Sequence, residues 1–272
     1  MNKELKIIAI DIDGTLLNSK KELTDRTKSV IKEAQEQGVI VVLATGRPSC
    51  GAVAYAEALE LEKYGGYLLS YNGGSIACCK TDEQIFNSIL DPSFIPQLYN
   101  DTSSRRVSIL SYQGDCIVTE NADCKYVEIE SRINNIPIRK VDCFVDAIIL
   151  PVVKCIALGE PDDMATLEFE MSKKYGEKLS IFRSEPFFVE FTSPRIDKGE
   201  SLNRLMVHLG MTKDNLIAFG DGFNDLTMIE YAGVGVAMSN AQEVLKDIAN
   251  VVAPSNDEDG VACIIEKLIL GK

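Results

Sequence analysis

The chain has 272 residues, of which 46% are hydrophobic and 25% are charged. This composition is typical of a globular protein with a sizeable core, and it excludes disordered and fibrous architectures. The 41 acidic residues outnumber the 28 lysines and arginines, which gives a formal net charge of −13. We therefore expect no nucleic-acid or membrane partner, because polyanions and anionic membrane surfaces bind basic faces.

The single histidine and the eight scattered cysteines limit the chemistry further. One imidazole cannot build a multi-histidine metal site, and the helical hydrophobic spacing around His208 predicts a helix-surface or packing role. The cysteines have no C-x-x-C pair and no zinc-ligand spacing, which is typical of buried thiols in a reducing cytosol. Since no apolar run approaches the roughly 18 residues of a bilayer span, we expect a cytoplasmic protein.

The first third of the chain alternates strand patterns with a helical pattern. Residues 6–10 and 39–44 are apolar runs, and the second has the continuous character of a strand buried on both faces of a parallel sheet. Residues 25–37 are a predicted helix that begins after a Thr N-cap and ends before a Gly. A third strand is predicted at 67–70.

The middle of the chain has a different rhythm. It contains hairpin-like segments at 106–112 and 116–119, then polar helices, and then strand patterns, which lie at 154–158, 179–183 and 187–191. This pattern is typical of an α+β domain. Because the parallel-sheet rhythm stops and later resumes, we interpret residues 83–189 as a domain inserted into a core made of 1–82 and 190–272.

The last third returns to the first rhythm. Its predicted elements are, in order, a helix at 198–209, a strand at 216–219, a helix at 225–232, a strand at 234–237 and a helix at 261–268. Strands that alternate with helices indicate a doubly wound, Rossmann-like α/β core with a parallel sheet.

Polar residues follow the first two predicted strands. In an open parallel sheet the functional residues gather at the carboxyl ends of strands. Asp11 and Asp13 follow the first strand, and their spacing of two lets both carboxylates point into one cavity. Thr45, Gly46 and Arg47 follow the second, and a hydroxyl, a permissive glycine and a bidentate cation suit a phosphate group.

A third strand end adds Asp221, Asn224 and Asp225. So many acids in one cavity would repel one another and raise each other's pKa values, so a cation is required. Hard oxygen ligands with neither His nor Cys nearby select Mg²⁺ over zinc or copper. Lys198, at the start of a predicted helix, can supply a compensating positive charge.

In this order, these segments resemble motifs one to four of the haloacid dehalogenase (HAD) superfamily: Asp11-Ile12-Asp13-Gly14-Thr15, Thr45-Gly46-Arg47, Lys198-Gly199 and Gly220-Asp221-Gly222-Phe223-Asn224-Asp225. Two further segments, Asn72-Gly73-Gly74 and residues 256–261, are similar to segments of the Cof-type sugar-phosphatase branch. That branch carries a large α/β cap (C2-type) as its inserted domain. The resemblance covers the core, and in the middle it extends only to the position and size of the cap.

The resemblance implies a phosphoric monoester hydrolase that acts on small phosphorylated metabolites, sugar phosphates in particular. It assigns Asp11 as the nucleophile that forms an aspartyl-phosphate. It assigns Asp13 as the acid and base, which requires a carboxyl whose pKa is held up while Asp11 stays ionised. It implies Mg²⁺ held by the Asp11 carboxylate, the Asp13 backbone carbonyl and Asp221, with Asp225 in the outer shell.

The same resemblance places Thr45, the Gly46 amide, Lys198 and Asn224 around the phosphoryl group. Arg47 lies beside these phosphate donors or orients the cap hinge. Four arginines of the cap are candidates for substrate contacts: Arg105, Arg106, Arg139 and Arg183. The ordinary expectation for such residues is a solvated position on the surface.

Two other functions stay open. A phosphomutase of the phosphomannomutase type has a similar core and cap and retains both aspartates. A non-catalytic sensor of a phosphorylated ligand is disfavoured by the intact set of acidic residues and lysine. The particular substrate and the oligomeric state are left undecided.

Overall fold

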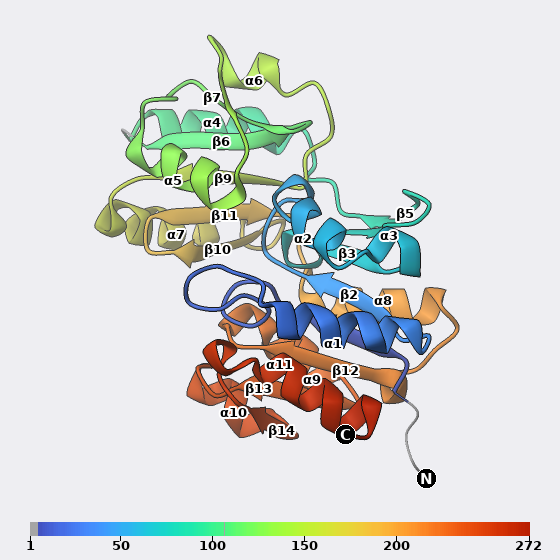
Figure 1. Ribbon diagram of the computed structural model, residues 1–272. Helices are drawn as coiled ribbons and strands as arrows, with labels where there is room; N and C mark the ends of the chain where they lie inside the picture. Colours follow the sequence, from blue (N-terminus) through green and yellow to red (C-terminus); the bar gives the residue numbers. More distant parts are fainter. Residues whose placement is uncertain (1–4, 106) are drawn as a thin grey trace. The chain divides into compact units, whose positions relative to one another are not determined.

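The structure is a computed structural model that describes residues 5–105 and 107–272. The chain divides into two compact units (Figure 1). The first unit comprises Met1–Phe86 and Asp197–Lys272, and the second comprises Asn87–Ile196. These boundaries lie a few residues later in the chain than the ones that we expect from the sequence.

The first unit is built on a mostly parallel sheet. Its strands are β1 (Ile7–Ile10), β2 (Ile40–Ala44), β3 (Tyr67–Ser70), β4 (Ser75–Cys78), β5 (Gln84–Asn87), β12 (Leu216–Gly220), β13 (Val234–Met238) and β14 (Val251–Ala253). Within the described residues their order is β14-β13-β12-β1-β2-β3-β4-β5. Neighbours run parallel from β14 to β3, and β4 pairs antiparallel with β3. The predicted doubly wound α/β core is confirmed.

Helices connect these strands. They are α1 (Asp25–Glu36), α2 (Val53–Ala58), α3 (Leu61–Tyr64), α8 (Lys198–His208), α9 (Leu226–Tyr231), α10 (Glu243–Ile248) and α11 (Gly260–Ile265). Helix α1 packs with α11, and α8 packs with α9. The side chain of Thr24 accepts a hydrogen bond from the Thr27 N–H and so caps α1, as predicted. His208 is exposed at the end of α8, also as predicted.

The second unit is an α+β unit with its own core. Its strands are β6 (Ser108–Gln113), β7 (Cys116–Thr119), β8 (Ile138–Lys140), β9 (Lys154–Leu158), β10 (Ser180–Glu185) and β11 (Phe188–Thr192), in the sheet order β10-β11-β9-β6-β7-β8. Its helices are α4 (Phe94–Ser103), α5 (Lys125–Asn134), α6 (Phe144–Ala147) and α7 (Pro161–Tyr175). Alternate residues of β9, Cys155 and Ala157, pack with Leu98 of α4 and Leu167 of α7.

Several predicted boundaries need correction. The helix that we expect at 225–232 starts one residue later, after a 3₁₀ turn. The helix that we expect at 261–268 ends at Ile265 and continues as a π-helical turn. The first residue of the hairpin-like segment at 106–112 lies outside the described residues. The additional short turns are η1 (Ser49–Gly51), η2 (Tyr71–Gly73), η3 (Lys213–Asn215), η4 (Phe223–Asp225), η5 (Asn256–Glu258) and η6 (Glu266–Leu270).

Within the described residues, none of the helices combines the length and the apolar character that a bilayer crossing requires.

Candidate active site

Three neighbouring strands of the first unit deliver the predicted acidic and phosphate-binding residues to one sheet edge. Strand β1 lies between β12 and β2, and Ile10 pairs with Phe219 on one side and with Leu43 on the other. Asp11 comes directly after Ile10, and its N–H donates to the Phe219 carbonyl at 3.0 Å. Because parallel strands end at the same edge, the loops that follow β1, β2 and β12 emerge together.

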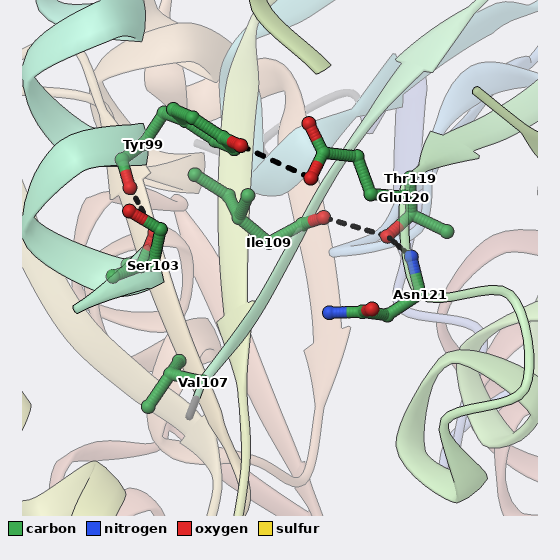
Figure 2. Close-up of a pocket in the computed structure, with 8 residues that line it drawn as sticks. Tyr99, Ser103, Val107, Ile109, Thr119, Glu120 and Asn121 are labelled. Carbon is green, nitrogen blue, oxygen red and sulfur yellow. Dashed lines mark hydrogen bonds between the residues drawn. The ribbon is translucent and has the colours of Figure 1, made fainter. Parts of the chain in front are cut away.

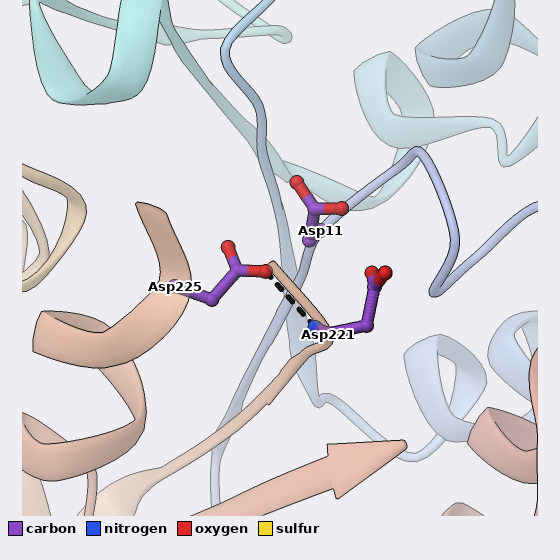
Figure 3. Close-up of side chains that lie close together, drawn as sticks. All are labelled: Asp11, Asp221 and Asp225. Atoms are coloured by element: carbon purple, nitrogen blue, oxygen red, sulfur yellow. Dashed lines mark hydrogen bonds between the residues drawn. The ribbon is translucent and has the colours of Figure 1, made fainter. Parts of the chain in front are cut away.

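Three carboxylates meet at this edge (Figure 3). One oxygen from each of Asp11, Asp221 and Asp225 lies within 4.8 Å of the others. Asp11 and Asp225 are buried, and Asp221 is half-buried. Asp221 and Asp225 belong to one segment after β12, whereas Asp11 follows β1, so the fold brings Asp11 to this segment.

Lys198 supplies the cation of the cluster. Its Nζ lies 2.6 Å from Asp11 Oδ1 and 2.6 Å from Asp225 Oδ1, and its side chain is fully buried. Lys198 is the first residue of α8, and this helix start is fixed because the Asp197 side chain accepts from the Glu200 N–H. Two carboxylates bond to the ammonium group and a third, Asp221, lies beside them, which leaves an excess of negative charge.

Asp225 orients other groups of the cluster. Its Oδ1 accepts from Lys198, and its Oδ2 accepts from the N–H groups of Asp221 (3.0 Å) and Gly222 (2.9 Å). Both carboxylate oxygens are therefore engaged with donors of the protein. This arrangement suits a residue that holds Lys198 and shapes the loop around Asp221.

Asp221 approaches the turn after β1 very closely. Thr15 Oγ1 donates to Asp221 Oδ1 at 2.6 Å. Gly14 has a φ of +88°, and a Cβ at this position would lie 2.3 Å from Asp221 Oδ2. Only glycine adopts this left-handed backbone without penalty and leaves room for the carboxylate. The turn after β1 therefore packs directly against the Asp221 side chain.

Burial and the neighbouring negative charge raise the pKa values of two carboxyls. Burial, followed by the negative charge of Asp225, raises the pKa of Asp11 well above its usual range, although Lys198 lowers it. Burial and the charge of Asp225 raise the pKa of Asp221 to about 6, against the lowering effect of the Thr15 hydrogen bond. Burial lowers the pKa of Lys198, but the charges of Asp11 and Asp225 raise it by more, so the ammonium form is stable.

Asp13 lies in a different environment from the one that we expect. Arg47 donates from Nε to Asp13 Oδ2 at 2.7 Å and from Nη2 to Oδ1 at 2.8 Å, and Lys21 Nζ donates to Oδ1 at 2.9 Å. Burial raises the pKa of Asp13, but the hydrogen bonds and charges of Arg47 and Lys21 lower it by more. The expected raised pKa at Asp13 is therefore wrong for this arrangement, because two cations stabilise the carboxylate.

The predicted phosphate-binding residues lie in the same unit. Thr45 is almost fully buried, and its Oγ1 accepts from the Arg47 N–H at 3.1 Å, so its O–H can still donate. Gly46 follows it. Asn224 is exposed, and its Nδ2 donates to Asn72 Oδ1 at 2.9 Å. The guanidinium of Arg47 is directed to Asp13.

Three residues at this edge have no role among those expected from the sequence: Thr15, Asn72 and Lys21. Thr15 and Asn72 lie in segments that resemble family motifs, so a signal for them was present. Lys21 had none, because an exposed lysine in a polar loop is the most ordinary residue on a protein surface. Its position on Asp13 depends on the path of the loop after β1.

Two of the four cap arginines pair with carboxylates of the second unit. Arg105 pairs with Glu170, and Arg183 Nε donates to Glu168 Oε2 at 2.7 Å. Arg139 lies exposed on β8. Arg106 lies outside the described residues. The ordinary surface role fits Arg105 and Arg183, because each already has a carboxylate partner on α7.

The second unit also contains a small hollow of about 250 Å³ (Figure 2). It is lined by Tyr99, Thr102, Ser103, Val107, Ile109, Thr119, Glu120 and Asn121. The Glu120 carboxylate accepts from the Tyr99 hydroxyl at 3.0 Å and from the Phe144 N–H at 2.8 Å. Its carboxylate thus joins α4, the end of β7 and α6.

The sequence and the structure both match known proteins. Residues 8–265 match the family model of the haloacid dehalogenase-like hydrolases. The chain belongs to this family. A crystal structure of a haloacid dehalogenase-like hydrolase from Bacteroides thetaiotaomicron is 43% identical, with a TM-score of 0.96, over 98% of this chain and 100% of that one. This match confirms the expected HAD membership.

Two curated relatives come from Bacillus subtilis (strain 168). YxeH is 34% identical over 98% of this chain and 99% of its own length. YcsE is named a 5-amino-6-(5-phospho-D-ribitylamino)uracil phosphatase, and it is 30% identical over 98% of this chain and 97% of its own length. The enzyme class that we expect from the sequence, a phosphatase of the HAD superfamily, is confirmed.

Proposed function

We propose that this phosphatase is Mg²⁺-dependent and hydrolyses phosphate monoesters of small metabolites, sugar phosphates in particular, through an aspartyl-phosphate at Asp11. The observation that carries the proposal is the position of Lys198 between Asp11 and Asp225, with Asp221 beside them. A buried nucleophilic carboxylate next to a fixed cation and an acidic cluster is the arrangement that phosphoryl transfer requires.

The donor set of the cluster fits a hard divalent cation. All three candidate ligands are carboxylates, and among the described residues Lys198 is the one ammonium group that pairs with them. Burial, and after it the charge of Asp225, raises the pKa values of Asp11 and Asp221. We assign Asp11 and Asp221 as the direct ligands, with the Asp13 backbone carbonyl as the third protein ligand and Asp225 in the outer shell. When bound, Mg²⁺ would neutralise Asp11 and the oxygens of the phosphoryl group.

The residues of the chain carry out the attack on phosphorus and hold the phosphoryl group. Asp11 attacks phosphorus, the P–O bond to the leaving group breaks, and an aspartyl-phosphate forms. Lys198 is held by Asp225, so it can interact with the phosphoryl oxygens without reorganisation. The Thr45 hydroxyl, the Gly46 N–H and the Asn224 amide complete the donor set around the phosphoryl group.

Asp13 is our candidate for the acid that protonates the leaving oxygen and the base that activates the hydrolytic water. In the present arrangement Arg47 and Lys21 hold it ionised. An anionic phosphate ester competes with Asp13 for the same two cations. We therefore assign Arg47 a second position, on the substrate phosphate, which releases the Asp13 carboxyl for proton transfer.

We assign substrate selection to the second unit, as the cap of the enzyme. The relative YcsE is named for a phosphate ester on a ribityl chain. Such a polyhydroxylated carrier supports sugar and sugar-alcohol phosphates as the first substrates to test here.

The test is a screen of phosphate release from a panel of phosphorylated metabolites, with and without Mg²⁺. We expect Mg²⁺-dependent release from several sugar phosphates and no net isomer formation. Isomerisation of a hexose phosphate without phosphate release would establish the phosphomutase instead. Absence of both activities over the panel would overturn the proposal in favour of a ligand sensor.

A further inference from the structure

The turn after β3 has an unusual backbone. Three successive residues have positive φ angles: Tyr71 (55°), Asn72 (55°) and Gly73 (98°). Glycine adopts this region easily, but two consecutive residues with a Cβ do so rarely. Such conformations persist where the surrounding structure fixes them, and they cluster at functional sites.

Backbone hydrogen bonds join this turn to the loop after β2. The Tyr71 N–H donates to the Arg47 carbonyl at 2.9 Å, and the Asn72 N–H donates to the Thr45 carbonyl at 2.9 Å. On the other side, Ser201 Oγ donates to the Gly73 carbonyl at 2.7 Å. The turn is therefore held against the loop that carries Thr45, Gly46 and Arg47.

The Asn72 side chain lies over this loop. A Cβ at Gly46 would be 3.1 Å from Asn72 Oδ1 and 3.2 Å from Asn72 Nδ2. Asn72 Oδ1 accepts from Asn224 Nδ2 at 2.9 Å. The amide thus bridges from the loop after β2 to the loop after β12, and its oxygen is the end that contacts Asn224. The Nδ2 end carries two N–H donors.

We propose that Asn72 is a further phosphate-binding residue: its Nδ2 donates to a phosphoryl oxygen of the substrate, while its Oδ1 holds Asn224 in position. This inference rests on the proposed function, because it places the phosphoryl group beside Gly46 and Asn224. The left-handed backbone at Tyr71 and Asn72 is unfavourable, but it directs this amide over Gly46. Tyr71 and Asn72 keep it because the turn is bonded on both sides.

A purely structural role predicts a different response to substitution. Asparagine is one of the residues that tolerates the left-handed region, so Asn72 could be no more than a turn residue. In that case glycine would be an equal or better replacement, because it adopts positive φ without a penalty. The two interpretations therefore diverge on Asn72→Gly.

The experiment compares Asn72→Gly with Asn135→Gly. Asn135 has nearly the same left-handed conformation (φ 54°, ψ 44°) and lies in the second unit at the end of α5. We expect both variants to keep or raise the melting temperature. Only Asn72→Gly should lower kcat/KM, on the order of 10- to 100-fold, the size expected for a lost hydrogen bond to a charged group. It should also raise the inhibition constant of inorganic phosphate.

Asn72→Asp separates the two ends of the amide. It retains an oxygen that can accept from Asn224, but it replaces the Nδ2 donor with a negative charge. We expect phosphate to inhibit Asn72→Asp even more weakly than Asn72→Gly. Wild-type phosphate affinity in Asn72→Asp would overturn the donor role at Nδ2.

The outcomes also separate this inference from the proposed function. If the wild-type protein and Asn135→Gly release phosphate, and Asn72→Gly does so with unchanged kcat/KM, the inference on Asn72 fails and the proposed function stands. If the wild-type protein has no phosphatase activity on the whole panel, the proposed function fails. Without activity, the inhibition by phosphate cannot be measured. The inference on Asn72 is then overturned together with the proposed function.

Discussion

Each of the two units buries a lysine against acidic residues, but the charges balance differently. In the second unit Lys154 Nζ lies 2.9 Å from Glu190 Oε1, with the two side chains 3% and 7% exposed. In the first unit Lys198 is fully buried between Asp11 and Asp225, and Asp221 adds a third carboxylate. Lys154 thus pairs with one glutamate, whereas Lys198 lies in a cluster of three carboxylates.

This difference separates a structural pair from a reactive cluster. A buried ion pair is stable when each charge has its partner, and removing one partner is costly. A buried cluster with more carboxylates than ammonium groups lowers the stability of the fold. Burial and the repulsion between the carboxylates also raise the pKa values of Asp11 and Asp221. We expect a protein to retain such a cost where an additional cation binds and chemistry takes place.

The largest effect should follow Asp11→Asn. The amide is no nucleophile, so we expect phosphate release to fall by at least about 10³-fold while the fold is retained. In the metal-free protein the variant should also unfold at a higher temperature, because one of the repelling carboxylates is gone. The matched control is Asp257→Asn, which removes a surface carboxylate that accepts from the Ser19 N–H. Near-normal hydrolysis by Asp11→Asn would refute the nucleophile assignment.

Asp13→Asn should come next and should depend on the substrate. Loss of general acid catalysis typically costs about 10²- to 10⁴-fold. We expect a loss in this range for sugar phosphates, whose alkoxide leaving groups need a proton, and a much smaller loss for p-nitrophenyl phosphate. The measurement is kcat/KM for a series of esters with graded leaving groups. Equal losses across the series would contradict the acid role.

Breaking the pair in the second unit should affect stability. Lys154→Met leaves Glu190 buried without its partner, and we expect a loss of about 3–5 kcal/mol in the free energy of unfolding. Lys246→Met is the control, because Lys246 Nζ lies at the same distance of 2.9 Å from Glu243 but Glu243 is 85% exposed. It should cost less than about 1 kcal/mol. Urea denaturation measures both, and equal losses would remove the contrast between buried and exposed pairs.

The smallest effect concerns pH and metal. In the metal-free protein the folded pKa of Asp221 is about 6, above the ordinary value of 3.8, so the folded state binds the proton more tightly than the unfolded state. Stability should therefore fall as pH rises through this window, and Asp11 acts in the same direction. Mg²⁺ should raise the melting temperature more above pH 6 than near pH 4. A pH-independent effect of Mg²⁺ would argue against binding at these carboxylates.

The sequence predicts the core of the fold well, because long apolar runs and their spacing are strong signals. The strands at 67–70, 116–119 and 154–158 appear with the predicted bounds. Short elements such as β4, β8 and α3 were not predicted, since three or four residues carry too little periodicity to indicate their structure.

The sequence likewise predicts some features of the candidate site and not others. The convergence of Asp11 and Asp221 follows from strand ends that share one sheet edge, which the order of segments already implies. Lys198 comes from the start of helix α8. The environment of Asp13 does not follow, because it depends on how the loop carrying Lys21 folds back and on which way the Arg47 side chain points. The bridge from Asn72 to Asn224 likewise joins side chains 152 positions apart in the chain.

The most direct test of the account is to look for the phosphorylated enzyme. The protein is mixed with Mg²⁺ and a sugar phosphate that it hydrolyses, quenched in acid during turnover, and reduced with borohydride, which converts an acyl phosphate into an alcohol. We predict that peptide mass spectrometry finds the modification at Asp11 and that Asp11→Asn lacks it. Full turnover with an unmodified Asp11, or with the modification on another carboxylate, would contradict the central claim.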